Sequence, residues 1–193
     1  MSRIELGDGY SKCKASLKKT SLDENGNAAK CYMTDSDLEV YDFDKVKERY
    51  VRSFGLAQMP KSVDALTSSV SGEFCLIEFK NGKLDKDKGE EVRRKAYDSL
   101  FILCDLLGIG PVQLRQKAVF VLVYNTEKNS FGGGSAESGT VNSLLRIKST
   151  IGNKANKPFI PRTLSGLVGF CLKDFHLVAQ DEFDTKILPC LEK

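Results

Sequence analysis

Residues 72–83 read "GEFCLIEFKNGK", and the expected fold follows from them. They contain a run, Phe74 to Ile77, that is apolar on both alternating faces, the pattern of a β-strand covered on both sides. Glu78 and Lys80 follow directly, and because residues two apart on a strand share a face, both side chains lie on the face of Phe74. A carboxylate against an apolar layer is costly unless it is paired or bound to a cation. The end of this strand therefore needs a physical explanation.

The segment before this strand carries a second carboxylate, Asp64. Residues 61–82, "KSVDALTSSVSGEFCLIEFKNG", contain two β-like runs separated by serines and a glycine, which predicts an antiparallel hairpin. A turn near residues 69–72 would return Asp64 to the neighbourhood of Glu78 and Lys80. Two close carboxylates repel one another, and a divalent cation relieves that repulsion. Because the donors are hard oxygens, the pattern predicts Mg²⁺ or Mn²⁺ rather than Zn²⁺.

Helices and further strands are expected around the hairpin. Helical spacing of apolar residues predicts one helix over residues 42–55 and a longer one over residues 90–108, each closed by a glycine. The run "KAVFVLVY", residues 117–124, predicts a buried strand beside the strand of residues 74–80. A late strand, or a helix-to-strand transition, is expected near residues 175–179. The expected fold class is α/β.

Composition bounds the class of protein. With 193 residues, 41% of them hydrophobic, the chain can bury one substantial core, and we expect a single domain. A formal net charge of +3 is too mild to identify a nucleic-acid partner by itself. No apolar segment approaches the roughly 20 residues of a membrane helix, and the N-terminus lacks the apolar core of a signal peptide. We expect a cytoplasmic protein without a membrane partner, and six free cysteines rather than a zinc site or disulfide framework.

The order of elements resembles the PD-(D/E)xK nuclease superfamily over roughly residues 40–125. That core is a helix, an antiparallel hairpin carrying Asp and then Glu-x-Lys, a crossover helix and a further strand. Asp64 stands as the hairpin aspartate, and Glu78 with Lys80 as the acid-x-lysine pair after "FCLI". The proline of the motif is absent beside Asp64, and Pro60 lies farther upstream. The resemblance implies a restriction endonuclease-like fold, a mixed central sheet with an antiparallel hairpin, flanked by helices.

The resemblance also implies a function, namely metal-dependent hydrolysis of phosphodiester bonds, in DNA rather than RNA. Asp64 and Glu78 would hold Mg²⁺ or Mn²⁺, with the Phe79 carbonyl as a further ligand. Lys80 would orient the attacking water or stabilise the charge that develops on the phosphate. Residues 37–125 would form the nuclease-like core, and residues 126–193 would complete it. Residues 1–36 are expected to be a basic N-terminal arm or hairpin.

Nucleic-acid contacts are expected from basic residues outside the metal centre. Arg94 and Lys95 lie in the first turns of the helix after the hairpin, within reach of a phosphate, although a solvated helix face explains them equally well. A second candidate patch lies near the N-terminus and would make salt-dependent backbone contacts. Its members are Lys12, Lys14, Lys18 and Lys19.

Several alternatives stay open. The same fold can serve as a noncatalytic module that binds nucleic acid or protein, and selectivity could come from a homodimer or a protein partner. If the strand merely surfaces after Ile77, Asp64 should lie far from Glu78. The other acid-x-lysine triplet, at Asp184, follows no apolar run and is discounted.

Three further features carry little functional weight. His176 is expected to be structural, and Glu48 is left out of the site because its helical position predicts exposure. The glycine-rich segment 131–139 is expected to be a flexible loop rather than a phosphate cradle, because no lysine and Ser/Thr follow it. A helix is possible around residues 140–149.

Overall fold

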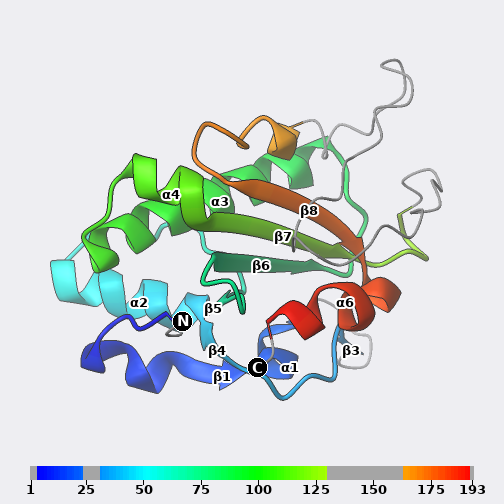
Figure 1. Ribbon diagram of the computed structural model, residues 1–193, viewed down its shortest axis with the longest axis horizontal. Coiled ribbons are helices and arrows are strands. Elements are labelled where there is room, and N and C mark those ends of the chain that lie inside the picture. Colours follow the sequence, from blue (N-terminus) through cyan, green and yellow to red (C-terminus); the bar gives the residue numbers. More distant parts are fainter. Residues whose placement is uncertain (1–3, 24–30, 130–162, 192–193) are drawn as a thin grey trace.

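A computed structural model describes residues 4–23, 31–129 and 163–191. The fold is α/β, with a mixed six-stranded sheet in the order β1-β4-β5-β6-β7-β8 flanked by helices (Figure 1). Strands β1, β4, β5 and β6 pair antiparallel, whereas β6, β7 and β8 pair parallel. The predicted fold class, a mixed central sheet with helices around it, is confirmed.

The sheet strands are short at one edge and longer in the middle, where apolar runs are covered on both faces. A separate two-stranded sheet pairs β2 (Leu22–Asp23) with β3 (Cys31–Tyr32). The six strands of the main sheet are β1 (Lys14–Ser16), β4 (Glu39–Asp42), β5 (Ala65–Ser68), β6 (Phe74–Lys80), β7 (Ala118–Tyr124) and β8 (Asp174–Ala179).

The predicted hairpin is formed by β5 and β6. Ala65 pairs with Ile77 and Ser68 with Phe74, and the turn between them contains Gly72 at φ 85°, a left-handed conformation that suits glycine. The Asp64 backbone N–H donates to the Ile77 carbonyl at 3.1 Å. This register places Asp64 beside the end of β6.

The two long helices follow their predicted patterns. Helix α2 (Phe43–Phe54) begins after Asp42, whose carboxylate accepts a hydrogen bond from the Lys45 N–H, and ends at Gly55 with φ 60°. Helix α3 (Lys86–Leu107) begins earlier than the predicted residue 90. The charged run before residue 90 supplies the first turn, because the Asp85 side chain caps the helix by accepting from the Lys88 N–H at 2.9 Å.

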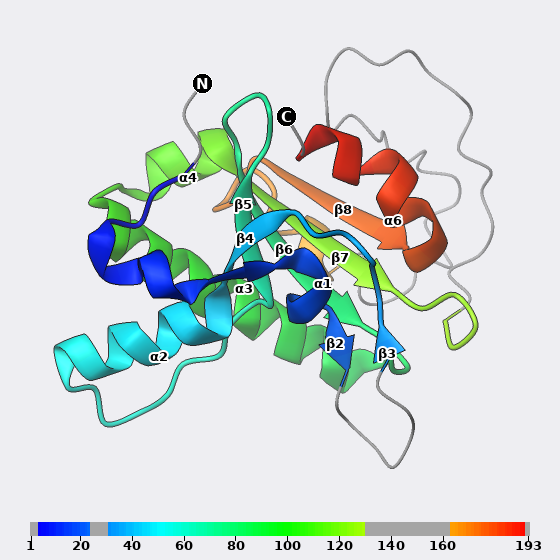
Figure 2. The same cartoon turned by 90° about the horizontal axis from the view of Figure 1, so that it is seen from below.

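The sheet buries a core on each face. Leu76, Phe120 and Leu122 lie on the face covered by α2 and α3, together with α4 (Pro111–Lys117). Ile77 and Val121 lie on the opposite face, against α6 (Gln180–Lys186). Figure 2 shows α2, α3 and α4 on one side of the sheet and α6 on the other. The strands between these helices therefore read as continuous apolar runs in the sequence.

The N-terminal segment is part of the packed fold. Residues 1–36 were expected to be a basic arm or hairpin, and β2 with β3 does form a short antiparallel pair. The segment also contributes the edge strand β1, a 3-10 helix over Asp8–Cys13, and α1 (Leu17–Thr20). Leu17 and Met33 are buried in the core. Scattered single apolar residues therefore anchor the described part of this segment without giving a periodic signal in the sequence.

The C-terminal part of the described chain continues the parallel sheet. β8 is the predicted late strand, and it leads directly into α6 and a short 3-10 helix over Leu188–Cys190. The expected loop at 131–139 and the possible helix at 140–149 lie outside the described residues. Within the described ranges no single helix has the length and apolar composition of a membrane span. Helices α3 and α4 meet that test only as a pair bent by 111°.

A hydrogen bond between α2 and α3 gives a test of their packing. The hydroxyl of Tyr50, which is buried, donates to Asp105 Oδ2 at 2.8 Å, and burial together with Asp105 raises the pKa of Tyr50 to about 12. We expect Tyr50→Phe to lower the free energy of unfolding by about 1–2 kcal/mol, because a partly buried hydrogen bond to the exposed Asp105 carboxylate is lost. Urea unfolding measures this. Tyr97→Phe, at an exposed position on α3, should change stability by under about 0.5 kcal/mol, and equal effects would contradict the assignment.

Candidate active site

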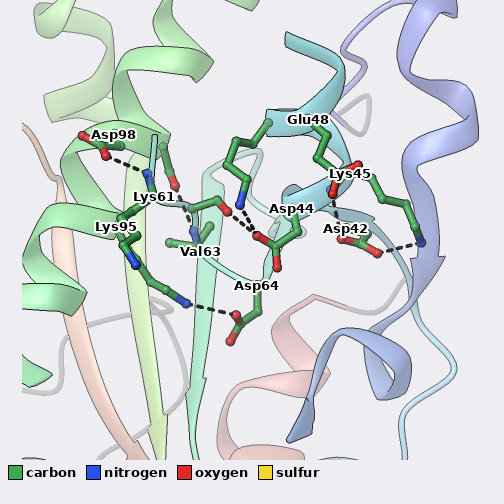
Figure 3. A network of polar contacts seen from close by, with 12 residues as sticks. Asp42, Asp44, Lys45, Glu48, Lys61, Val63, Asp64, Lys95 and Asp98 are labelled. Carbon is green, nitrogen blue, oxygen red and sulfur yellow. Dashed lines mark hydrogen bonds and ion pairs between the residues drawn. The ribbon is translucent and has the colours of Figure 1, made fainter. Parts of the chain in front are cut away.

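Three predicted site residues meet at the C-terminal end of β6, together with Lys95 from α3. The Lys95 ammonium lies 2.7 Å from Glu78 Oε1 and 3.4 Å from Asp64 Oδ1, and Lys80 Nζ lies 2.8 Å from the same Glu78 oxygen. Figure 3 shows Lys95 reaching from α3 to Asp64. The alternative in which the strand merely surfaces after Ile77 required Asp64 to lie far from Glu78, and it is contradicted.

Burial makes this cluster unlike a surface ion-pair network. The Glu78 side chain is 0% exposed, whereas Asp64, Lys80 and Lys95 keep 18%, 18% and 15% of their side-chain surface. Glu78 Oε2 is buried and has no hydrogen-bond partner within the described ranges. A buried carboxylate oxygen left without a donor is costly, so the site has capacity for a further cation or donor.

The backbone of β6 fixes the orientation of Asp64. The Phe79 N–H donates to Asp64 Oδ2 at 2.7 Å, which leaves Oδ1 directed toward Lys95. Phe79 itself packs at 5.6 Å, ring centroid to ring centroid, on Phe183 of α6. The carboxylate is therefore held by a strand that is anchored on its other face.

Electrostatics in the cluster are dominated by burial and by the two carboxylates. Burial, followed by the charge of Glu78, raises the pKa of Asp64 to about 7, and Lys95 opposes that rise. Burial alone would lower the pKa of Lys95, but Glu78 and Asp64 outweigh it and raise that pKa. Lys95 is therefore a permanent positive charge between two acidic groups.

The raised pKa of Asp64 predicts a pH-dependent stability. Between pH 3.8 and about 7, the folded protein retains a proton on Asp64 that the unfolded chain has lost. The folded state binds more protons, so the contribution of Asp64 to the free energy of unfolding falls as pH rises through this window, by at most about 4 kcal/mol. Asp64→Asn has no titrating carboxyl group at this position and therefore lacks this pH-dependent contribution. In EDTA, urea unfolding should show the variant gaining stability over wild type as pH rises, and a difference independent of pH would contradict the assignment.

The cluster opens into a groove of about 1000 Å³. The groove is lined by α1 and β2, the first turns of α2, the end of β6 with the loop after it, the start of α3, and Lys128. Its lining includes Asp64, Phe79, Lys80 and Lys95, while Glu78 lies behind them. Solvent and ligands therefore approach the carboxylates through this groove.

The structure divides the predicted nucleic-acid contacts. Lys95 and Lys19 line the groove. Arg94 points elsewhere on α3 and pairs with Asp98 at 3.6 Å. The remaining N-terminal lysines do not line the groove: Lys12 is exposed on the first 3-10 helix, Lys14 pairs with Glu39 and Glu5, and Lys18 pairs with Asp35. The candidate patch is therefore not one surface with the site.

Acidic residues of α2 were missed as part of the site. Asp42, Asp44 and Glu48 line the groove, and Figure 3 shows them on α2 and its cap. Asp44 accepts from Ser62 Oγ at 2.5 Å and from Lys47 Nζ at 2.6 Å; these contacts outweigh burial and lower its pKa. Asp42 and Asp44 stand at the start of the helix predicted over residues 42–55, a position typical of capping residues. Glu48 is exposed as predicted, but its exposed surface belongs to the groove.

The features given little weight lie elsewhere. Asp184 is on α6, where it accepts from Thr34 Oγ1 at 2.7 Å, and its triplet does not follow a strand. His176 is buried on β8, and burial lowers its pKa, so the ring is neutral. The six cysteines are free. None of these residues lines the groove.

The donor set is compatible with a hard cation. The Asp64 and Glu78 carboxylates both contact one cation, the Lys95 ammonium. Glu78 Oε2 has no hydrogen-bond partner among the described residues and could act as a further oxygen ligand. In the described ranges no group of three or more His, Cys, Asp or Glu side chains is arranged to hold a metal ion. Mg²⁺ fits such a sparse set, because it keeps several waters and takes one or two carboxylates plus substrate phosphate.

Comparisons with known proteins add no assignment: no protein-family model, curated protein or solved structure matches the chain. Any function proposed for this protein therefore rests on the geometry of its own residues.

Proposed function

We propose that the protein is a metal-dependent nuclease of the PD-(D/E)xK type that hydrolyses phosphodiester bonds in DNA, with Mg²⁺ or Mn²⁺ as cofactor. The observation that carries the proposal is the hairpin register, which brings Asp64 to Glu78 and Lys80 at the base of a groove. A carboxylate pair with a lysine at one strand end is the arrangement that the resemblance implies for metal-dependent hydrolysis.

The arrangement of elements supports the restriction endonuclease-like interpretation. Helix α2 precedes the β5–β6 hairpin, α3 crosses over, and β7 returns parallel to β6. This is the element order of the resemblance over residues 40–125. The site lies at the carboxyl end of β6, where open α/β sheets commonly bind ligands.

Each residue of the cluster has a role under this proposal. Asp64 and Glu78, with the Phe79 carbonyl, would hold the ion, which when bound polarises the scissile phosphate and lowers the pKa of a coordinated water. Lys80, only 18% exposed and held against Glu78, is placed to orient that water or to stabilise charge developing on the phosphate. Lys95 adds a second ammonium in contact with Asp64 and Glu78.

A noncatalytic binding module is the second candidate, and one observation favours it. Lys80 and Lys95 already neutralise Asp64 and Glu78 by direct contacts of 2.7–3.4 Å, so the cluster can persist without an ion. Such a module would bind nucleic acid or protein through the groove and would keep that affinity when Asp64 or Glu78 is changed.

The discriminating experiment is a cleavage assay on labelled oligonucleotides. Purified protein is incubated with single-stranded and duplex DNA and RNA, in Mg²⁺, in Mn²⁺ and in EDTA. The nuclease proposal expects products with a metal and none in EDTA, with DNA preferred. Absence of cleavage on every substrate with both metals would favour the binding module. A homodimer or protein partner, and the cytoplasmic location, remain predictions.

A further inference from the structure

The charges that line the groove are unevenly distributed. The side formed by α2 carries Asp42, Asp44 and Glu48 with a single lysine, Lys45. The other segments that line the groove, which we call the basic side, include four that carry exposed lysines: α1, the loop after β6, the start of α3 and the loop after β7. These lysines are Lys19, Lys83, Lys88 and Lys128.

A network of asparagine side chains fixes two of these segments to one another. The buried Asn129 side chain donates to the carbonyls of Gly82 and Asn125, each at 3.0 Å, and accepts from the Leu84 N–H at 2.7 Å. Asn125 Nδ2 in turn donates to Asn81 Oδ1 at 2.8 Å. The loops that follow the parallel strands β6 and β7 therefore form one unit, which carries both Lys83 and Lys128.

The basic side retains positive charge after its own ion pairs are counted. Asp23 accepts from Asn81 Nδ2 at 3.0 Å, and Glu91 pairs with Lys88 at 2.7 Å. Among the described residues none forms an ion pair with Lys19 or Lys83, and Lys128 contacts only the neutral Asn81 Oδ1, at 3.4 Å. Figure 2 shows β2 at the end of β6, where α3 begins, so these segments converge in space.

We propose that the basic side of the groove binds the sugar-phosphate backbone of a nucleic-acid strand on one side of the scissile phosphate, an inference that rests on the proposed nuclease function. Lysines that several segments present to one groove can each contact a phosphate of the same strand. The acids of the α2 side repel phosphates, so the strand is gripped on one side of the metal centre only. Lys12 and Arg94, which lie outside the groove, make no such contact.

The test is the salt dependence of binding, measured by fluorescence anisotropy of labelled DNA in EDTA so that no cleavage occurs. Lys83→Gln/Lys128→Gln removes two charges from the basic side. Lys12→Gln/Arg94→Gln removes two exposed charges outside the groove and serves as the matched control. The plot of log K against log salt has a negative slope. We expect its magnitude to decrease by about 1.8 for duplex DNA, or about 1.4 for a single strand, in the groove variant only.

The outcomes separate this inference from the proposed function. If the two double variants have equal slopes while wild type still cleaves DNA, the inference fails and the nuclease proposal stands. If the groove variant alone loses slope but no substrate is cleaved, the binding surface stands and the nuclease proposal fails. No binding and no cleavage by wild type would overturn both. Polyglutamate that binds as tightly as DNA of equal charge would show that the groove takes an acidic polypeptide, and would overturn the inference.

Discussion

Glu78→Gln is expected to reduce DNA cleavage by about 10³-fold or more while the protein remains folded. Glu78 is the buried carboxylate of the cluster, and its Oε2 is the oxygen without a partner in the described structure. Gln keeps the shape but removes the charge that would hold a divalent cation. Because metal coordination contributes several kcal/mol to stabilising the transition state, and about 4 kcal/mol corresponds to about 10³-fold in rate, the loss should be large.

The control for this variant lies on the same hairpin. Glu73 is also buried, sits just before the opposite end of β6, and is paired with Lys173 and bonded to Ser69 and Ser71. Glu73→Gln should leave the cleavage rate of the folded protein unchanged. Single-turnover cleavage rates with Mg²⁺, compared after circular dichroism has verified folding, provide the measurement. Comparable losses of cleavage rate in the two variants would contradict the assignment, because removing any buried charge from this hairpin would then lower the rate.

Lys95→Met is expected to lower the free energy of unfolding by about 3–5 kcal/mol in EDTA, because it leaves Asp64 and Glu78 facing one another without their shared cation. Met preserves most of the buried stem. Lys88→Met, on the same helix but with an exposed side chain paired to Glu91, should cost under about 1 kcal/mol. Urea unfolding in EDTA gives both values.

Lys95→Met also measures the repulsion between the Asp64 and Glu78 carboxylates. Adding Glu78→Gln to Lys95→Met should recover part of the lost stability, because the repulsion between the two acids disappears. Mn²⁺ should stabilise Lys95→Met more than it stabilises wild type, since the ion replaces the missing ammonium between Asp64 and Glu78. A Lys95→Met protein as stable as Lys88→Met, and indifferent to Mn²⁺, would contradict the described geometry.

The sequence predicted the hairpin and the long helices because each has a local signal. Apolar alternation and the serine-rich turn define β5 and β6, and the register then follows from the short connection between them. This is why Asp64, Glu78 and Lys80 could be placed together in advance. The start of α3 was wrong because a capping aspartate, Asp85, makes a charged run compatible with a first helical turn.

The rest of the site depends on contacts between distant segments. Asp44 carries an N-terminal helix pattern, which gives no sign that it lines the same groove as Asp64. Lys83 and Lys128 are 45 residues apart, and only the parallel pairing of β6 with β7 and the buried Asn129 bring their loops together. Of the four predicted N-terminal lysines only Lys19 lines the groove, because the 3-10 helix, β1 and α1 each set the direction of their own side chains.

Mn²⁺ binding by Asp64 and Glu78 can be followed by the electron paramagnetic resonance signal of free Mn²⁺. Wild type and Asp64→Asn are titrated with and without a DNA oligonucleotide. The proposed site predicts that wild type removes one Mn²⁺ per chain from solution, more tightly when DNA supplies a phosphate ligand, and that Asp64→Asn does not. Equal binding by the two proteins, or no binding by wild type even with DNA, would contradict the assignment of Asp64 and Glu78 as a metal centre.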